Sequence, residues 1–220
     1  MKNIAFIPLR GGSVSIPLKN IKLLNGRPLA YYALDAATAC ELIDTVVVAT
    51  DSDEIAKVIR EYPSDKIMVI GRSEEVSTNV SPTIEVVLEV SQQIQYTNLI
   101  LIQATSPLIS ADDITKGIQL LDQGYDSVVS VVRQHRFIWD EDTKNPINYT
   151  IPNKPRRQDW QGILVENGAF YINTRDNILK DKFYLSGKIG LYEMLADTYV
   201  DIDEDHDWLI IEQILKSKNK

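Results

Sequence analysis

Short apolar runs alternate with amphipathic segments along the first 132 residues of the chain. The runs are rich in β-branched residues and continuous rather than alternating, which is typical of strands covered on both faces. They predict strands at 4–8, 45–49, 66–70, 99–102 and 127–132. Apolar positions at helical spacing predict helices at 28–37, 52–61, 82–95 and 114–121, and Ser110 and Asp113 have capping-box spacing ahead of the last. This order predicts an α/β fold with a Rossmann-like, mostly parallel sheet and helices on both faces.

The periodic pattern stops between Arg133 and Glu166, in a stretch rich in Arg, Asp, Asn, Pro and Trp. A structureless loop of that length is unusual in a compact domain, so we expect an arm that is either a functional excursion or an oligomerisation element. We interpret residues 1–220 as one domain that carries this arm. Further on, the pattern predicts strands at 168–172, 189–194 and 198–202 and helices at 174–180 and 204–216.

Composition narrows the classes of function. The chain has 23 Lys and Arg against 31 Asp and Glu, a net charge of −8, which argues against nucleic acid or an anionic membrane as the main partner. Cys40 is the single cysteine, so an internal disulfide is excluded and a zinc cluster is not indicated. The sequence has no apolar run of the roughly 20 residues that a membrane helix needs. Met1 leads directly into the first strand without a leader pattern, so we expect a cytoplasmic protein.

The first predicted strand is followed by Arg10-Gly11-Gly12-Ser13, with Lys19 and Asn20 shortly after. Two glycines after a buried strand let backbone N–H groups converge on an anion, and Arg10 and Lys19 add positive charge. The third glycine of the dinucleotide fingerprint and the Gly-Lys-Ser/Thr of the Walker loop are both missing. The loop therefore indicates either an anion site or a Gly-Gly turn with two surface cations.

Val200-Asp201-Ile202-Asp203 is the second informative stretch. Side chains two apart in a strand share a face, so the two carboxylates can point at one cation, and Mg²⁺ is usually held by one or two carboxylates together with substrate phosphates. The alternative is a solvated acidic strand end before a helix, because Glu204, Asp205 and Asp207 follow.

Other polar residues follow the predicted strands, where open α/β sheets bind ligands. These residues are Asp51, Arg72, Gln103 to Ser106 and Asn167. We expect them to form one site together with the first loop and Asp201. Within the arm, Arg156 and Arg157 stand beside Trp160. Such a group can close over an anionic substrate or can anchor an interface, and both roles are compatible.

Several motifs, in the same order along nearly the whole chain, resemble those of the N-acylneuraminate cytidylyltransferases, the CMP-sialic acid synthetases. The resemblance lies closest to the animal-type branch, which includes enzymes that use the deaminated sugar KDN. It rests on Arg10 to Ser13 with Ile16 to Asn20, Ala49-Thr50-Asp51, Gln103-Ala104-Thr105-Ser106-Pro107, Arg156-Arg157-Gln158-Asp159-Trp160, Glu166 to Tyr171, and Val200 to Asp203.

The resemblance implies an enzyme that joins CTP to a nine-carbon 2-keto-3-deoxy sugar acid, releases pyrophosphate and uses Mg²⁺. It implies that Arg10 and Lys19 hold the CTP phosphates and that Asn20, Arg72, Ser81 and Thr83 contact the nucleotide. By the same similarity, Gln103 reaches the sugar and Asp201 and Asp203 bind the metal. Arg157 matches the family's catalytic arginine, on a dimerisation arm that reaches the partner's active site. A homodimer, or a tetramer made of two dimers, is implied.

The chain departs from the family pattern in the first loop. The family usually reads Gly-Ser-Lys-Gly-Ile-Pro, whereas this chain has Val14 in place of the lysine, and Asn79 stands where an aspartate is common. A charge-assisted contact contributes roughly 1.5–3 kcal/mol, so a missing cation weakens the site rather than abolishing it. The open alternatives are the same chemistry with KDN, legionaminate, pseudaminate or Kdo, and a non-catalytic nucleotide-binding homologue. The general base is Asp201 or a metal-bound hydroxide.

Overall fold

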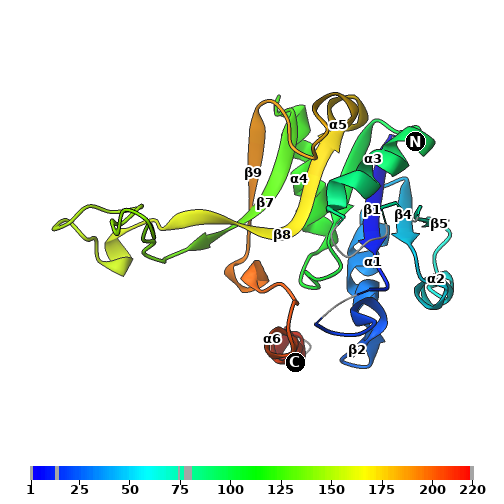
Figure 1. Ribbon diagram of the computed structural model, residues 1–220, viewed down its shortest axis with the longest axis horizontal. Helices are drawn as coiled ribbons and strands as arrows, with labels where there is room; N and C mark the ends of the chain where they lie inside the picture. Colours follow the sequence, from blue (N-terminus) through cyan, green and yellow to red (C-terminus); the bar gives the residue numbers. More distant parts are fainter. Residues whose placement is uncertain (1, 13–14, 74, 77–80, 219–220) are drawn as a thin grey trace.

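The computed structural model describes residues 2–12, 15–73, 75–76 and 81–218. Its main element is a seven-stranded sheet (Figure 1). The strand order is β5 (Ile67–Gly71), β4 (Thr45–Thr50), β1 (Asn3–Leu9), β6 (Asn98–Ile102), β8 (Ile163–Thr174), β7 (Ser127–Gln134) and β9 (Ile189–Met194). β8 runs antiparallel to both β6 and β7, and the other neighbouring pairs are parallel. The predicted mostly parallel α/β sheet is confirmed.

Both faces of the sheet are buried at the strands β1, β4 and β6, which explains their continuous apolar runs. In β1, Ile4 and Phe6 point to one face, while Ala5 and Ile7 point to the other, and all four are fully buried. The Ala5 face packs against α1 (Leu29–Ala39), α2 (Asp53–Arg60) and α4 (Ala111–Asp122). The Ile4 face packs against α3 (Thr83–Gln93) and α5 (Arg175–Asp181).

Side-chain caps fix where two of the predicted helices begin. Ser52 Oγ accepts a hydrogen bond from Ile55 N at the start of α2. At α4, Ser110 Oγ accepts from Asp113 N at 3.2 Å, and Asp113 Oδ2 accepts from Ser110 N at 2.9 Å. The reciprocal pair confirms the predicted capping box with Asp in the place usually taken by Glu or Gln.

A third cluster lies below the sheet in Figure 1, where the chain ends. It joins α6 (Asp205–Lys218) to β2 (Leu23–Leu24) and to the first residue of α1. β2 pairs with β3 (Arg27–Pro28), and the short 3-10 helix η1 (Lys19–Ile21) precedes this hairpin. Leu24, Trp208 and Ile211 form the buried centre of the cluster. Within the described ranges, no helix is both long enough and apolar enough to span a membrane.

Residues 198–202 do not form the predicted strand. They belong to a 3-10 helix, η3 (Ala196–Tyr199), and an irregular segment after it. Thr198 donates to Leu195 O from both its backbone N and its Oγ1, at 3.0 and 2.7 Å, and these local bonds close a tight turn instead of a ladder.

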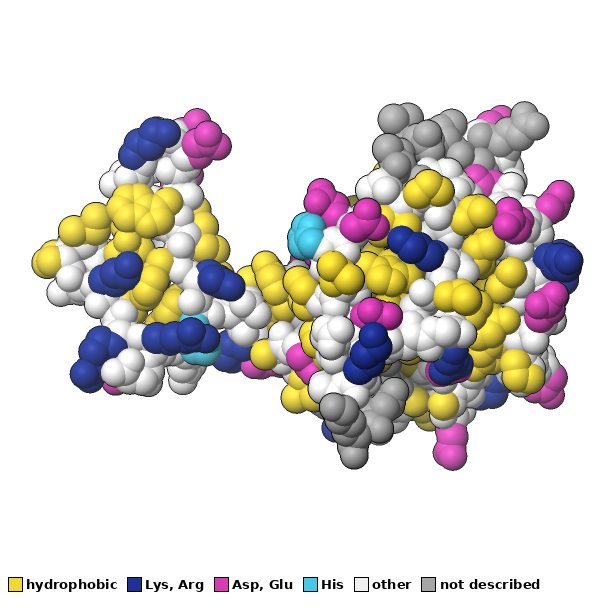
Figure 2. All heavy atoms as spheres, turned by 90° about the horizontal axis from the view of Figure 1, so that it is seen from below, with side chains coloured by type: hydrophobic (Ala, Val, Ile, Leu, Met, Phe, Trp, Pro, Cys, Tyr) yellow, Lys and Arg dark blue, Asp and Glu magenta, His cyan; other side chains and the backbone are white. Residues whose placement is uncertain are grey.

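The 133–166 stretch contains more strand than the sequence predicts, because β7 continues to Gln134 and β8 begins at Ile163. Residues 135–162 project beyond the sheet as the arm, shown in yellow-green in Figure 1. Aromatic contacts hold the arm together: Phe137 stacks on Trp160 with ring centroids 5.0 Å apart, and Tyr149 contacts Phe137 edge-on. Figure 2 shows the arm standing apart from the body, with apolar and basic side chains on the visible face.

Candidate active site

A cavity of about 410 Å³ opens at the carboxyl ends of β1 and β6. Its walls come from segments far apart in the sequence, as expected for the crevice of an open α/β sheet. The cavity is lined by the predicted residues Arg10, Lys19, Asn20, Arg72, Ser81, Thr83, Gln103, Asp201 and Asp203. Arg157 does not line it and lies exposed on the arm.

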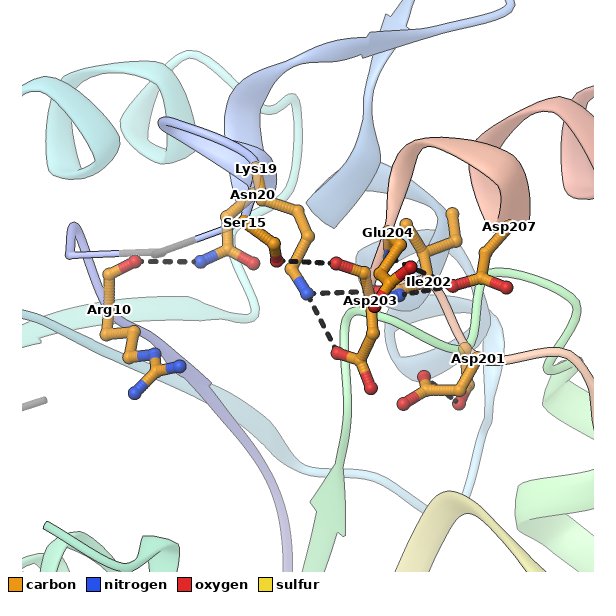
Figure 3. Close-up of polar contacts among 10 residues, drawn as sticks. Arg10, Ser15, Lys19, Asn20, Asp201, Ile202, Asp203, Glu204 and Asp207 are labelled. Atoms are coloured by element: carbon orange, nitrogen blue, oxygen red, sulfur yellow. Dashed lines mark hydrogen bonds and ion pairs between the residues drawn. The ribbon is translucent and has the colours of Figure 1, made fainter. Parts of the chain in front are cut away.

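The loop after β1 is fixed by two side chains from other parts of the chain. Gly11 N donates to Asp51 Oδ1 at 2.8 Å, and Asn20 Nδ2 donates to the Arg10 carbonyl at 3.0 Å (Figure 3). A Cβ atom on Gly11 would lie 2.9 Å from the Ser52 Cβ, so the close approach requires glycine. The described part of the loop is therefore held in place by contacts with other segments, and Arg10 lines the cavity. Ser13 and Val14 lie outside the described residues.

Lys19 is a buried cation at the edge of the cavity. Its Nζ donates to the Ile202 carbonyl at 2.7 Å and to Asp203 Oδ1 at 3.1 Å. The Lys19 side chain is 10% exposed, whereas that of Asp203 is 73% exposed. An ammonium has three N–H donors, and two of them are used within the described residues, which leaves one there for an anionic ligand.

Asp201 and Asp203 both line the cavity, although residues 200–203 form no strand. The predicted alternation holds, since Ile202 between them is fully buried. Burial raises the pKa of Asp201, and the Asp203 charge acts in the same direction. Hydrogen bonds from Thr105 and Ser106 and the charge of Lys19 oppose this rise in the Asp201 pKa. The acidic residues that follow serve the start of α6, as the alternative interpretation expected for that part of the stretch. Asp207 Oδ2 accepts hydrogen bonds from the backbone N of Asp203 and of Glu204.

This donor set fits a divalent cation that also takes ligands from a bound molecule. In the part of the chain that the structure describes, no group of three or more His, Cys, Asp or Glu side chains converges to form a complete metal site. Mg²⁺ does not need one, because it is usually held by one or two carboxylates, water and substrate phosphates. A cation would also neutralise the repulsion between Asp201 and Asp203 that contributes to the Asp201 pKa shift.

The cavity is also lined by Arg72, and by Ser81 and Thr83 at the start of α3. Burial lowers the pKa of Arg72, and the neighbouring Asp51 charge opposes this effect. Arg72 donates from Nη2 to the Val76 carbonyl, while its buried Nε has no partner within the described residues. Asn79 lies outside those residues.

Asn167 is a correction to the predicted site. It lies inside β8, not at a strand end, and is buried. Its Nδ2 donates to Thr198 Oγ1 at 3.1 Å and to the Thr198 carbonyl, so it supports η3 and does not line the cavity. The sequence pattern misplaced it because β8 begins five residues earlier than the predicted strand at 168.

Two tyrosines in the cavity wall were missed by the sequence analysis. Tyr171 and Tyr184 line the cavity with ring centroids 4.6 Å apart. Tyr171 OH donates to Glu166 Oε2 at 3.0 Å, and burial followed by the Glu166 charge raises the Tyr171 pKa. Tyr171 belongs to a motif that the sequence analysis had noted, but Tyr184 follows α5 in a stretch without any recognisable pattern.

Comparisons with known proteins show the family to which the chain belongs. A family model described as cytidylyltransferase matches residues 4–218. N-acylneuraminate cytidylyltransferase A of Danio rerio is 42% identical over 95% of this chain and 50% of its own length. CMP-N,N'-diacetyllegionaminic acid synthase of Legionella pneumophila is 29% identical over 98% of this chain and 97% of its own length.

A solved structure of CMP:2-keto-3-deoxy-manno-octonic acid synthetase complexed with CTP superimposes with a TM-score of 0.74, covers 99% of this chain and 100% of its own, and is 16% identical. That likeness supports the fold, which is the nucleotide-diphospho-sugar transferase fold. The chain spans about half the length of the fish relative. Since the family model covers nearly every residue, the chain belongs to the cytidylyltransferase family.

Proposed function

We propose that this chain transfers CMP from CTP to a sialic-acid-type sugar, a nine-carbon 2-keto-3-deoxy sugar acid, and releases pyrophosphate. The observation that carries the proposal is the charge arrangement of the cavity. Arg10, Lys19 and Arg72 bring positive charge to the cavity, which also holds the carboxylate pair Asp201 and Asp203. A nucleoside triphosphate with a divalent cation has the complementary charges. The identity to the fish enzyme supports the sugar class.

The residues divide between the two substrates. Arg10 and the free N–H of Lys19 bind the phosphates, and Asn20, Arg72, Ser81 and Thr83 hold the nucleotide. Gln103, which lies beyond the end of β6 at the cavity wall, contacts the sugar. Their task is to bring the two substrates into line and to balance the phosphate charge.

The proposed cofactor is Mg²⁺, which Asp201 and Asp203 would hold. When bound, it neutralises charge on the phosphates and stabilises the departing pyrophosphate. The chain's own residues then act on the sugar and the nucleotide.

The anomeric oxygen of the sugar forms a bond to the α-phosphorus of CTP, and the bond from that phosphorus to the bridging oxygen of pyrophosphate breaks. The hydroxyl proton leaves to a base. Asp201 lies in the cavity and is the carboxylate that we propose accepts it.

Arg157 requires a second copy of the chain if it acts in catalysis, because it lies on the arm and not in its own cavity. We therefore propose a homodimer in which the arm of each copy reaches the cavity of its partner. The arm has the exposed apolar side chains that an interface needs, among them Ile147 and Ile151. We also propose a cytoplasmic location, which suits a chain whose single cysteine, Cys40, is buried.

The test is pyrophosphate release from CTP and Mg²⁺ with N-acetylneuraminate, KDN, legionaminate, pseudaminate and Kdo in parallel wells, each with a chelator control. Release with one or two of these sugars, abolished by the chelator, is the expected result. The legionaminate well tests the alternative that the Legionella relative favours. Silence with every sugar from folded protein that binds CTP would instead favour a non-catalytic homologue, and Val14→Lys would then be the next variant.

A further inference from the structure

The two carboxylates of the cavity are held in different ways. Asp203 is largely exposed and pairs with Lys19. Asp201 is more deeply placed, and its Oδ1 accepts a hydrogen bond from Ser106 Oγ at 3.2 Å. Ser106 is 3% exposed, so its hydroxyl is sheltered from water that would compete for this bond.

The backbone around Ser106 is itself fixed. Ser106 N donates to the Gln103 carbonyl at 3.2 Å, which closes the turn after β6. Ile202 N donates to the Thr105 carbonyl at 2.9 Å, which ties the Asp201 segment to the same turn. The Ser106 hydroxyl therefore comes from a turn whose backbone is bonded on both sides, and it can hold Asp201 in one orientation.

We infer that Ser106 is a positioning residue that aims the Asp201 carboxylate at the divalent cation of the cavity. The inference rests on the proposed function, which supplies the cation. Ser106 occupies one lone pair of Oδ1, Thr105 also donates to this carboxylate, and the remaining acceptor positions are left for the metal. It performs for Asp201 the role that hydrogen-bonded neighbours of metal-binding carboxylates commonly have. Without the Ser106 hydroxyl, the Asp201 carboxylate loses one of the hydrogen bonds that fix its orientation. It can then rotate away from the position in which it and Asp203 would hold the metal together.

A merely structural serine would behave differently. Its loss would lower the melting temperature and leave metal affinity unchanged. Ser110 provides the matched control, because it lies four residues away, its hydroxyl caps α4, and it does not line the cavity. Ser110→Ala removes a hydroxyl from the same segment without touching Asp201.

The experiment measures Mn²⁺ binding directly, by electron paramagnetic resonance of the free ion, in the presence of CTP. Four proteins are compared, each at the same interval below its own melting temperature: wild type, Ser106→Ala, Ser106→Thr and Ser110→Ala. We expect Ser106→Ala to weaken Mn²⁺ binding roughly tenfold, the scale of one hydrogen bond to a charged group. Ser110→Ala should bind as wild type does, and Ser106→Thr should recover most of the affinity because it keeps the hydroxyl.

Equal Mn²⁺ affinity in wild type and Ser106→Ala would overturn the inference. An equal loss in Ser106→Ala and Ser110→Ala would also overturn it, because the effect would then be one of stability. Absence of Mn²⁺ binding by wild type with CTP would overturn the metal assignment of the proposed function, and this inference with it, and is recognised before any variant is measured.

Discussion

The cavity and the arm differ in the contacts that hold their side chains in place. In the cavity, hydrogen bonds between distant segments hold the side chains, as Asp51 holds Gly11 and Ser106 holds Asp201. The arm, residues 135–162, is held by ring contacts around Phe137 and by hydrogen bonds between residues close in sequence, and it leaves Trp139, Ile147 and Ile151 exposed. The cavity is thus held in shape within one chain, whereas the arm leaves apolar side chains uncovered, which a second copy would cover in the proposed homodimer.

Asp201→Asn should have the largest effect on the function of the cavity. The change removes a charge from the proposed metal site while keeping the shape of the side chain. We expect turnover to fall on the order of a hundredfold or more, the scale seen when an electrostatic contact to the reacting group is lost. Pyrophosphate release measures turnover, and circular dichroism checks the fold. Near-wild-type turnover by a normally folded variant would refute the metal assignment.

Phe137→Ala should disturb the packing of the arm most selectively. Phe137 stacks on Trp160 and lies under Lys154 Nζ at 4.3 Å, so its removal loosens the arm without touching the sheet. We expect weaker dimerisation in sedimentation experiments and activity lower by roughly tenfold, on the scale of a lost aromatic contact.

Phe170→Ala provides the contrast, because Phe170 is fully buried in the sheet core. It should cost about 3–5 kcal/mol of unfolding free energy. A similar loss of melting temperature in Phe137→Ala would mean that the arm and the body fold as one unit, against the comparison.

A smaller effect follows from the pKa of Asp201. Because burial raises this pKa above its ordinary value of 3.8, the folded chain holds the proton more tightly than the unfolded chain. Unfolding free energy therefore falls as pH rises from the unfolded to the folded pKa, and the loss is complete at neutral pH.

Asp201→Asn removes this penalty, so with a chelator present it should melt above wild type at pH 7. The difference should disappear near pH 3, below both pKa values. A variant that melts lower than wild type at pH 7 would contradict the direction of the pKa shift.

Much of the cavity could be predicted because its residues follow buried strands. β1 and β6 are apolar on both faces, which identifies them in the sequence, and Arg10 and Gln103 come soon after they end. The same logic failed for Asn167, since β8 already begins at Ile163 and Asn167 therefore lies in the interior of the strand. The predicted strand at 198–202 failed because Thr198 bonds locally to Leu195.

Other features have no local signal. The hydrogen bond from Ser106 to Asp201 joins residues 95 positions apart, and the antiparallel direction of β8 depends on the path of the arm. Arg157 was identified by its motif alone, and sequence reasoning within one chain does not give its distance from the cavity.

The most direct test of the account mixes two inactive variants, Arg157→Ala and Asp201→Asn, co-expressed in equal amounts with different tags. Random pairing makes half of the dimers mixed. If the arm of one copy completes the cavity of its partner, each mixed dimer has one cavity that contains Asp201 and receives a partner arm with Arg157. The account predicts that pyrophosphate release recovers to about a quarter of the wild-type rate. Activity no higher than that of the two single variants, from protein shown to contain mixed dimers, would contradict it.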